Sequence, residues 1–153
     1  MAAVAAVAVA AGCALSGCGK TESPAAAVRS WATAGTFEQG AQYLIVDADR
    51  VHDAIGARRP AIVVRTNCLE LFQEAEGENT DLLPTPDPQL TNLLSAGYDL
   101  FVHASDQCSS NAGSATTLAI VDRELSRALG DVYAAVFREE AVTGHHLGVP
   151  GLQ

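Results

Sequence analysis

The residues of this chain that are best suited to chemistry are its four cysteines, Cys13, Cys18, Cys68 and Cys108. A thiol can form a disulfide, bind a metal or accept a covalent modification. Their spacing matches no zinc-binding pattern, in which cysteines come in close pairs, and four are too few for a disulfide-dense miniprotein. The segment around each cysteine must therefore decide its role.

The first two cysteines lie in or beside an uncharged segment at the start of the chain. Met1 to Ala14 is rich in Ala and Val, too short for a membrane span of about 20 residues but as long as the core of a secretory signal. Leu15-Ser16-Gly17-Cys18 follows at once and resembles the lipobox of bacterial lipoproteins. The resemblance implies cleavage between Gly17 and Cys18, and a diacylglycerol on the Cys18 sulfur. No Lys or Arg precedes the run, so we expect the natural start to lie upstream of Met1. The alternative is an Ala-rich buried helix with a chance cysteine.

A phosphate-binding motif overlaps the same stretch. Ala14 to Thr21 fits a relaxed phosphate-loop pattern, in which Lys20 and Thr21 would reach a phosphate and Mg²⁺, with Leu118 to Asp122 as the matching metal-binding segment. The Ala-dominated run makes a poor central strand, and Pro24 interrupts the helix that should follow. The rest of the chain lacks alternating strands and helices. A nucleotide-binding enzyme is therefore the weakest of our hypotheses.

His52 is the one histidine that falls on an apolar helical face. A histidine inside a helical bundle can ligate haem or a metal. A second ligand is hard to find, because His103 points away from the apolar face of its helix, His145-His146 lies in a Gly-rich tail and Met1 is the only methionine. We favour a histidine at the core boundary that bonds to a neighbouring helix, and we predict no metal and no cofactor.

The acidic residues show no catalytic arrangement. They gather on the polar sides of the expected helices, in Asp47, Asp49 and Asp53 and in Glu70, Glu74, Glu76 and Glu78. Eighteen Asp and Glu against nine Lys and Arg give a net charge of −9, which excludes binding to a nucleic-acid backbone. A hydrophobic content of 48% excludes wholesale disorder. We predict a soluble acidic surface on a protein that is not an enzyme.

Four segments with helical periodicity must position these residues. We expect four helices, each with one apolar face. They cover about 36–55, a second segment that begins at Pro60 and whose end the weak helix formers around Gly77 leave open, 88–108 and 114–140. Thr36 and Gln39 have the spacing of a capping box, while Asp87 and Pro88 are typical of a helix start. Short connections favour antiparallel neighbours, so the predicted fold is all-α, an up-down-up-down four-helix bundle.

Cys68 and Cys108 remain when Cys13 is removed with the signal and Cys18 carries the lipid. Both fall near the centre of an apolar arc, and a disulfide between them would close a loop worth roughly 4 kcal/mol in the chain-entropy model. If the second helix ended near Gly77, the sulfurs would miss by more than about 10 Å at ~1.5 Å per residue. We therefore predict that this helix extends to about Leu82. Two separately buried thiols are the alternative.

The whole pattern is similar to the small secreted and lipid-anchored helical proteins of actinobacteria. The similarity rests on the lipobox, the pairs Asn67-Cys68 and Gln107-Cys108, and Pro86-Asp87 before a helix. Eight Arg against one Lys, with abundant Ala, suits a high-GC genome. The similarity covers about residues 15–140. It implies a fold and a location, and it supplies no activity because that group has no settled function.

These observations divide the chain into four parts. Residues 1–17 are predicted to be the signal peptide, 18–35 the lipidated N-terminus and a flexible linker, 36–142 the bundle and 143–153 a disordered tail. The expected function is that of a lipoprotein on the extracytoplasmic face of the cell membrane, a non-catalytic binding or structural module for an envelope protein or small ligand. The leading alternative is a haem or small-ligand carrier built around His52. No nucleic acid is expected as a partner.

Overall fold

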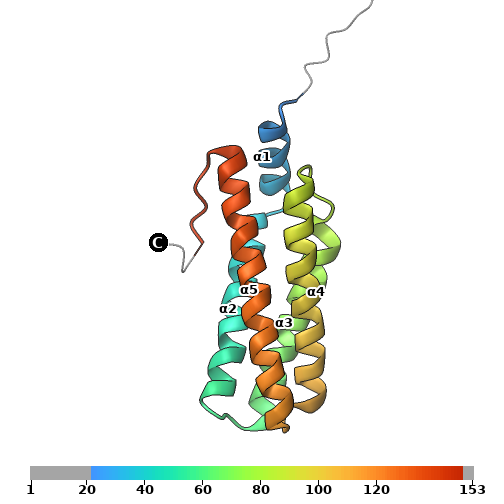
Figure 1. Cartoon of the computed structure of the whole chain (residues 1–153), viewed down its shortest axis with the longest axis vertical. Helices are drawn as coiled ribbons and strands as arrows, with labels where there is room; N and C mark the ends of the chain where they lie inside the picture. Colours follow the sequence, from blue (N-terminus) through green and yellow to red (C-terminus); the bar gives the residue numbers. More distant parts are fainter. Residues whose placement is uncertain (1–21, 150–153) are drawn as a thin grey trace, which may run out of the picture.

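The structure is a computed structural model that describes residues 22–149. The signal segment, Cys13, Cys18 and the phosphate-loop residues Lys20 and Thr21 lie outside these residues. The described part forms helices and no strands, so the all-α prediction is confirmed, but it holds five helices where four were predicted. They are α1 (Pro24–Ala34), α2 (Phe37–Gly56), α3 (Ala61–Leu82), α4 (Pro88–Asn111) and α5 (Ala115–Thr143). Four long helices lie side by side, and α1 sits at one end of them (Figure 1).

The additional helix, α1, occupies most of the segment that we expected to be a flexible linker. The Ser23 side chain accepts a hydrogen bond from the Ala26 amide, and Pro24 takes the first helical position. Five alanines follow within the helix, and alanine is the strongest helix former. Val28 is buried against the bundle. The prediction of a flexible 18–35 linker is therefore wrong for residues 24–34, since the Ala content that suggested a spacer favours a helix.

The observed ends of the long helices agree only in part with those predicted from the sequence. α3 runs to Leu82, as the disulfide required, and the Asp87 side chain accepts from the Leu90 amide at 2.8 Å as the expected N-cap of α4. The capping box at the start of α2 was wrong. Thr36 makes no side-chain cap, because the tight turn from α1 puts it in a left-handed conformation (φ 55°).

The core runs along the inner faces of α2 to α5. Most residues of the apolar faces predicted for these helices are buried, although Ala61 at the start of α3 is exposed. α4 packs most closely against α5 and α3. Gly97 of α4 allows this closeness, since a Cβ there would lie 3.2 Å from a methyl carbon of Val132. Such contacts fix the spacing of helices at native packing density.

The segment after α5 folds back along the bundle. Gly144 ends the helix with φ 69°, a conformation that glycine adopts without strain. The Leu147 amide then donates to Glu140 at 2.7 Å and the Gly148 amide donates to Glu38 at 3.0 Å, while Val149 is buried. The prediction of a disordered 143–153 tail is thus wrong for residues 143–149, and residues 150–153 lie outside the described part.

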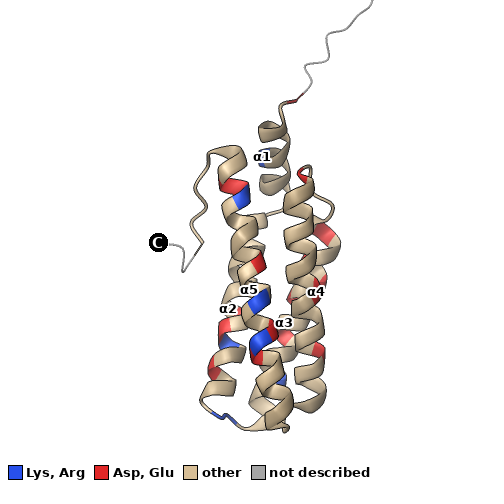
Figure 2. Ribbon diagram, viewed as in Figure 1, with Lys and Arg blue, Asp and Glu red and all other residues tan. Residues whose placement is uncertain are grey.

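The two ends of the bundle differ, and we name them for use below. The α1 end comprises α1, the connection 83–87 and the segment 144–149; the far end comprises the connections 57–60 and 112–114. Figure 2 shows acidic residues along the helices and basic residues in the connection at the far end, which carries Arg58 and Arg59. Within residues 22–149, no helix is long and apolar enough to cross a membrane.

Candidate functional site

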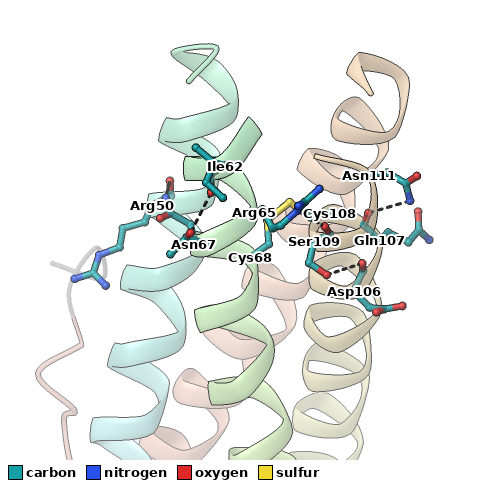
Figure 3. Close-up of a disulfide and its surroundings, with 11 residues drawn as sticks. Arg50, Ile62, Arg65, Asn67, Cys68, Asp106, Gln107, Cys108, Ser109 and Asn111 are labelled. Carbon is teal, nitrogen blue, oxygen red and sulfur yellow. Dashed lines mark hydrogen bonds between the residues drawn. A yellow bond between two sulfur atoms is a disulfide. The ribbon is translucent and has the colours of Figure 1, made fainter. Parts of the chain in front are cut away.

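The disulfide joins α3 to α4 near the far end. Cys68 and Cys108 are bonded, their Cα atoms are 6.0 Å apart and both side chains are fully buried (Figure 3). Beside the bridge, Arg65 donates to the Ser109 carbonyl oxygen at 3.0 Å, which adds a second link between the same helices. Two buried free thiols are therefore excluded. The bridge is a structural element enclosed in the core.

His52 lies at the edge of the core and is bonded to a neighbouring helix, as we favoured. Its Nδ1 atom lies 2.6 Å from Oδ1 of Asp122 on α5, and the His52 side chain is 23% exposed. Asp122 is thus the partner of a histidine in the middle of a helix, although the sequence offered it as a metal-binding residue after a strand. The pair links α2 to α5.

The other histidines do not add a second ligand. His103 contacts Glu124 and Gln107 on the outer surface of α4 and α5, and His146 lies 3.6 Å from Glu140 at the α1 end. In the part of the chain that the structure describes, no group of three or more His, Cys, Asp or Glu residues is placed to hold a metal ion. His52 also lines an open cavity of about 600 Å³, with Arg50, Asp53 and Asn67 among the other lining residues.

A cavity at the α1 end brings together residues from four segments. Its volume is about 430 Å³, within the roughly 300–1,000 Å³ of small-ligand pockets. The lining comes from α1, the start of α2, the end of α5 and the segment 144–149, and consists of Arg29, Ala32, Thr33, Thr36, Glu38, Gln39, Gln42, Glu139, His145 and Leu147. The cavity thus exists only because α1 and the last segment fold onto the bundle.

Glu139 is the most unusual residue of this lining. It is 1% exposed, and its Oε2 atom has no hydrogen-bond partner among the described residues. Burial raises the pKa of its carboxyl group, and a hydrogen bond from Thr143 together with the charges of His145 and Arg29 acts in the opposite direction. A buried carboxylate without a full set of partners is costly, so this position is poorly explained by folding alone.

Arg29 supplies a positive charge to the same cavity. Its guanidinium donates to the carbonyl oxygen of Thr143 at the end of α5, which ties α1 to α5. Among the described residues, no ion pair joins Arg29 to Glu139 or to Glu38. The guanidinium group has five N–H donors in total, so donors remain for a further acceptor.

Glu78 of α3 is a second carboxyl group at an inward position. It lies against Gly40 of α2, where a Cβ atom would collide with its carboxylate, and its Oε2 atom is buried without a partner. Burial, and then the charges of Glu74 and Asp81, raise its pKa to about 7. Burial and then the Glu78 charge also raise the pKa of Tyr98, whose hydroxyl is buried and unpartnered.

The sequence offered a signal for both carboxyl groups. Glu139 stands three residues after Val136 in the apolar stripe of α5, and Glu78 stands three residues after Ala75 in that of α3. We had placed Glu78 on a solvated face and had not singled out Glu139. Extending each stripe by one turn would have found both of them.

The chain was also compared with known proteins. No protein-family model, curated protein or solved structure matches it. The function must therefore be argued from the residues and their geometry.

Proposed function

We propose that the chain is a lipoprotein of the extracytoplasmic face of the cell membrane, where it acts as a non-catalytic ligand-binding module. The diacylglycerol on Cys18 anchors it, and α2 to α5 form an antiparallel up-down-up-down bundle that supports the binding site. The cavity lined by Glu139 and Arg29 is the site at which the ligand binds.

The observation that carries the proposal is the buried disulfide between Cys68 and Cys108. Disulfides persist in oxidising compartments and are rare in a reducing cytoplasm. Such a bridge fits the resemblance of residues 15–18 to a lipobox, because both features belong to a protein that has left the cytoplasm. A diacylglycerol adds two acyl chains, which hold a protein at a membrane more firmly than one.

The short distance between anchor and bundle supports a definite orientation. α1 begins at Pro24, six residues after Cys18, and a chain of that length reaches at most about 20 Å. α1 is fixed to the bundle, since Trp31 donates from Nε1 to the Leu82 carbonyl oxygen at 2.8 Å and packs against Phe37, with the ring centroids 5.2 Å apart and the ring planes tilted by 38°. In this proposal the α1 end, with its cavity, faces the membrane.

The anchor is tested by fractionating cells that express variants in which one cysteine is replaced by alanine. Cys18→Ala should move the protein out of the membrane fraction, whereas Cys13→Ala, a matched change inside the signal, should leave it there. Membrane association that survives Cys18→Ala would show that the lipoprotein assignment is wrong.

A further inference from the structure

The cavity at the α1 end contains two opposite charges that do not satisfy each other. Glu139 is buried with an unpartnered Oε2 atom, and Arg29 lines the same cavity from α1. They are near enough for the Arg29 charge to act on the Glu139 carboxyl, yet no ion pair joins them. The Glu139 carboxylate is covered in this structure, so a ligand that bonds to both residues must displace the atoms that cover it.

We propose that this cavity binds a small zwitterionic ligand of the amino-acid or dipeptide class, with its ammonium group on Glu139 and its carboxylate on Arg29. An ammonium group supplies three N–H donors, which suits a carboxylate oxygen that lacks a partner. A carboxylate matches the planar fork of a guanidinium group, and charge-assisted hydrogen bonds of both kinds are stronger than neutral ones.

Ligands of one charge fit the lining less well. A simple cation would gain from Glu139 and Glu38 but would be repelled by Arg29 at the same cavity. A simple anion would meet the reverse problem and would leave the buried carboxyl without a donor. Opposite charges on one ligand avoid both penalties, since like-charge contacts and unpaired buried charges are what specific sites exclude.

The rest of the lining suits the remainder of such a ligand. Ala32 and Leu147 offer apolar surface to a side chain, and the Gln42 amide offers both a donor and an acceptor to a peptide group. A volume of about 430 Å³ accommodates an amino acid or a dipeptide. The segment 144–149, held by Glu38 and Glu140, forms one wall.

This inference names the ligand of the proposed binding module and rests on that function, but its test is independent of the anchor. The full-length chain is screened by saturation-transfer NMR against the free amino acids and the glycyl dipeptides. The strongest binder is then compared with its N-acetylated form and its amide, and ¹⁵N spectra report which backbone amides shift.

We expect at least one zwitterion to bind, with shifts centred on Leu147 and Gly148, and each capped form to bind at least about tenfold more weakly, as loss of one charge-assisted bond implies. Glu139→Gln and Arg29→Gln should each weaken binding by a similar factor. Matched surface changes, Glu70→Gln and Arg127→Gln, should have no effect.

The proposal is overturned if no zwitterion binds at millimolar concentration, or if the capped forms bind as well as the free one. It is equally overturned if Glu139→Gln and Arg29→Gln, folded by circular dichroism, bind like the parent chain. Because Arg29 is exposed, Arg29→Gln gives a result even if the Glu139 variant does not fold. Failure of these tests leaves the Cys18 anchor unaffected.

Discussion

The two ends of the bundle fill equivalent inward positions with different chemistry. Near the far end, the inward positions of α3 and α4 carry Cys68 and Cys108, which are covalently joined and dry. Towards the α1 end, the apolar stripes of α3 and α5 continue through Glu78 and Glu139, each with an unpartnered carboxylate oxygen. One end is closed by a covalent bond, and the other is left with unused hydrogen-bonding capacity.

In our proposal, this difference separates the part of the protein that stabilises the fold from the part that binds a ligand. A disulfide and apolar packing need no ligand to be satisfied, whereas buried carboxyl groups without partners cost stability until something bonds to them. The α1 end is also built in part from residues 24–34 and 144–149, which belong to the two segments that were expected to be flexible. We expect it to be the less stable end, and in our proposal it is the end that binds the ligand.

The largest effect should come from removing the disulfide. Cys68→Ala with Cys108→Ala opens a closed loop of about 40 residues, which costs roughly 4 kcal/mol of unfolding free energy. For a domain of this size the midpoint of thermal unfolding should fall by on the order of 10–20 °C. A reductant should lower the parent to the same midpoint and leave the double variant unchanged. An unchanged midpoint in the double variant would show that the disulfide at the far end does not stabilise the fold.

A smaller and local effect should follow from Trp31→Ala. The change removes the bond to the Leu82 carbonyl oxygen and the contact with Phe37, and we expect a loss of about 2–3 kcal/mol. Hydrogen exchange should accelerate in 24–34, while α3 and α4 around the disulfide keep their protection. Trp31→Phe, which keeps a ring and loses only the bond, should cost about 1 kcal/mol. Uniform acceleration along the chain would show that the two ends do not differ in local stability.

Glu78 should make stability depend on pH. Its carboxyl has a pKa of about 7 in the folded protein against an ordinary 4.5, so the folded state holds a proton that the unfolded chain releases between these values. Its contribution to stability is full below about pH 4.5 and is lost as the pH rises through about 7.

Glu78→Gln should therefore raise the unfolding midpoint at pH 8 and change it little at pH 4. The exposed Glu70→Gln is the control and should show no such dependence. A parent chain and a Glu78→Gln variant with parallel pH profiles would show that this carboxyl is ionised at neutral pH.

The smallest effect is expected at His52. The pair with Asp122 is partly exposed, and such pairs contribute about 1 kcal/mol or less. His52→Ala and Asp122→Asn should each lower the unfolding midpoint by a few degrees at most. The double variant should lower the midpoint by no more than the sum of the two single decreases. A Soret band in the purified parent that His52→Ala abolishes would instead support the haem carrier.

Periodicity predicted the parts of the fold that depend on apolar packing. The stripes of the four long helices follow from residue spacing, because burial requires one apolar face per helix. The extension of α3 to Leu82 followed from the reach that the disulfide requires, and the Asp87 cap followed from an aspartate directly before Pro88. The disulfide followed from counting the cysteines that remain after Cys13 and Cys18 are assigned.

The α1 end could not be predicted in the same way. α1 has an Ala-rich composition that suits a spacer as well as a helix, and only its contacts through Val28 and Trp31 decide between the two. The cavity depends on segments more than a hundred residues apart, joined by the Arg29 to Thr143 and Gly148 to Glu38 bonds. Such long-range contacts leave no local pattern in the sequence.

The central claim, an anchored protein with a covalently closed far end, is tested most directly by the intact mass of the chain isolated from its native host. We predict a polypeptide that begins at Cys18, carries a diacylglycerol and lacks two hydrogens relative to its free-thiol form, as the Cys68–Cys108 bond requires. A chain that retains residues 1–17, or one that carries free thiols at Cys68 and Cys108, would contradict the account.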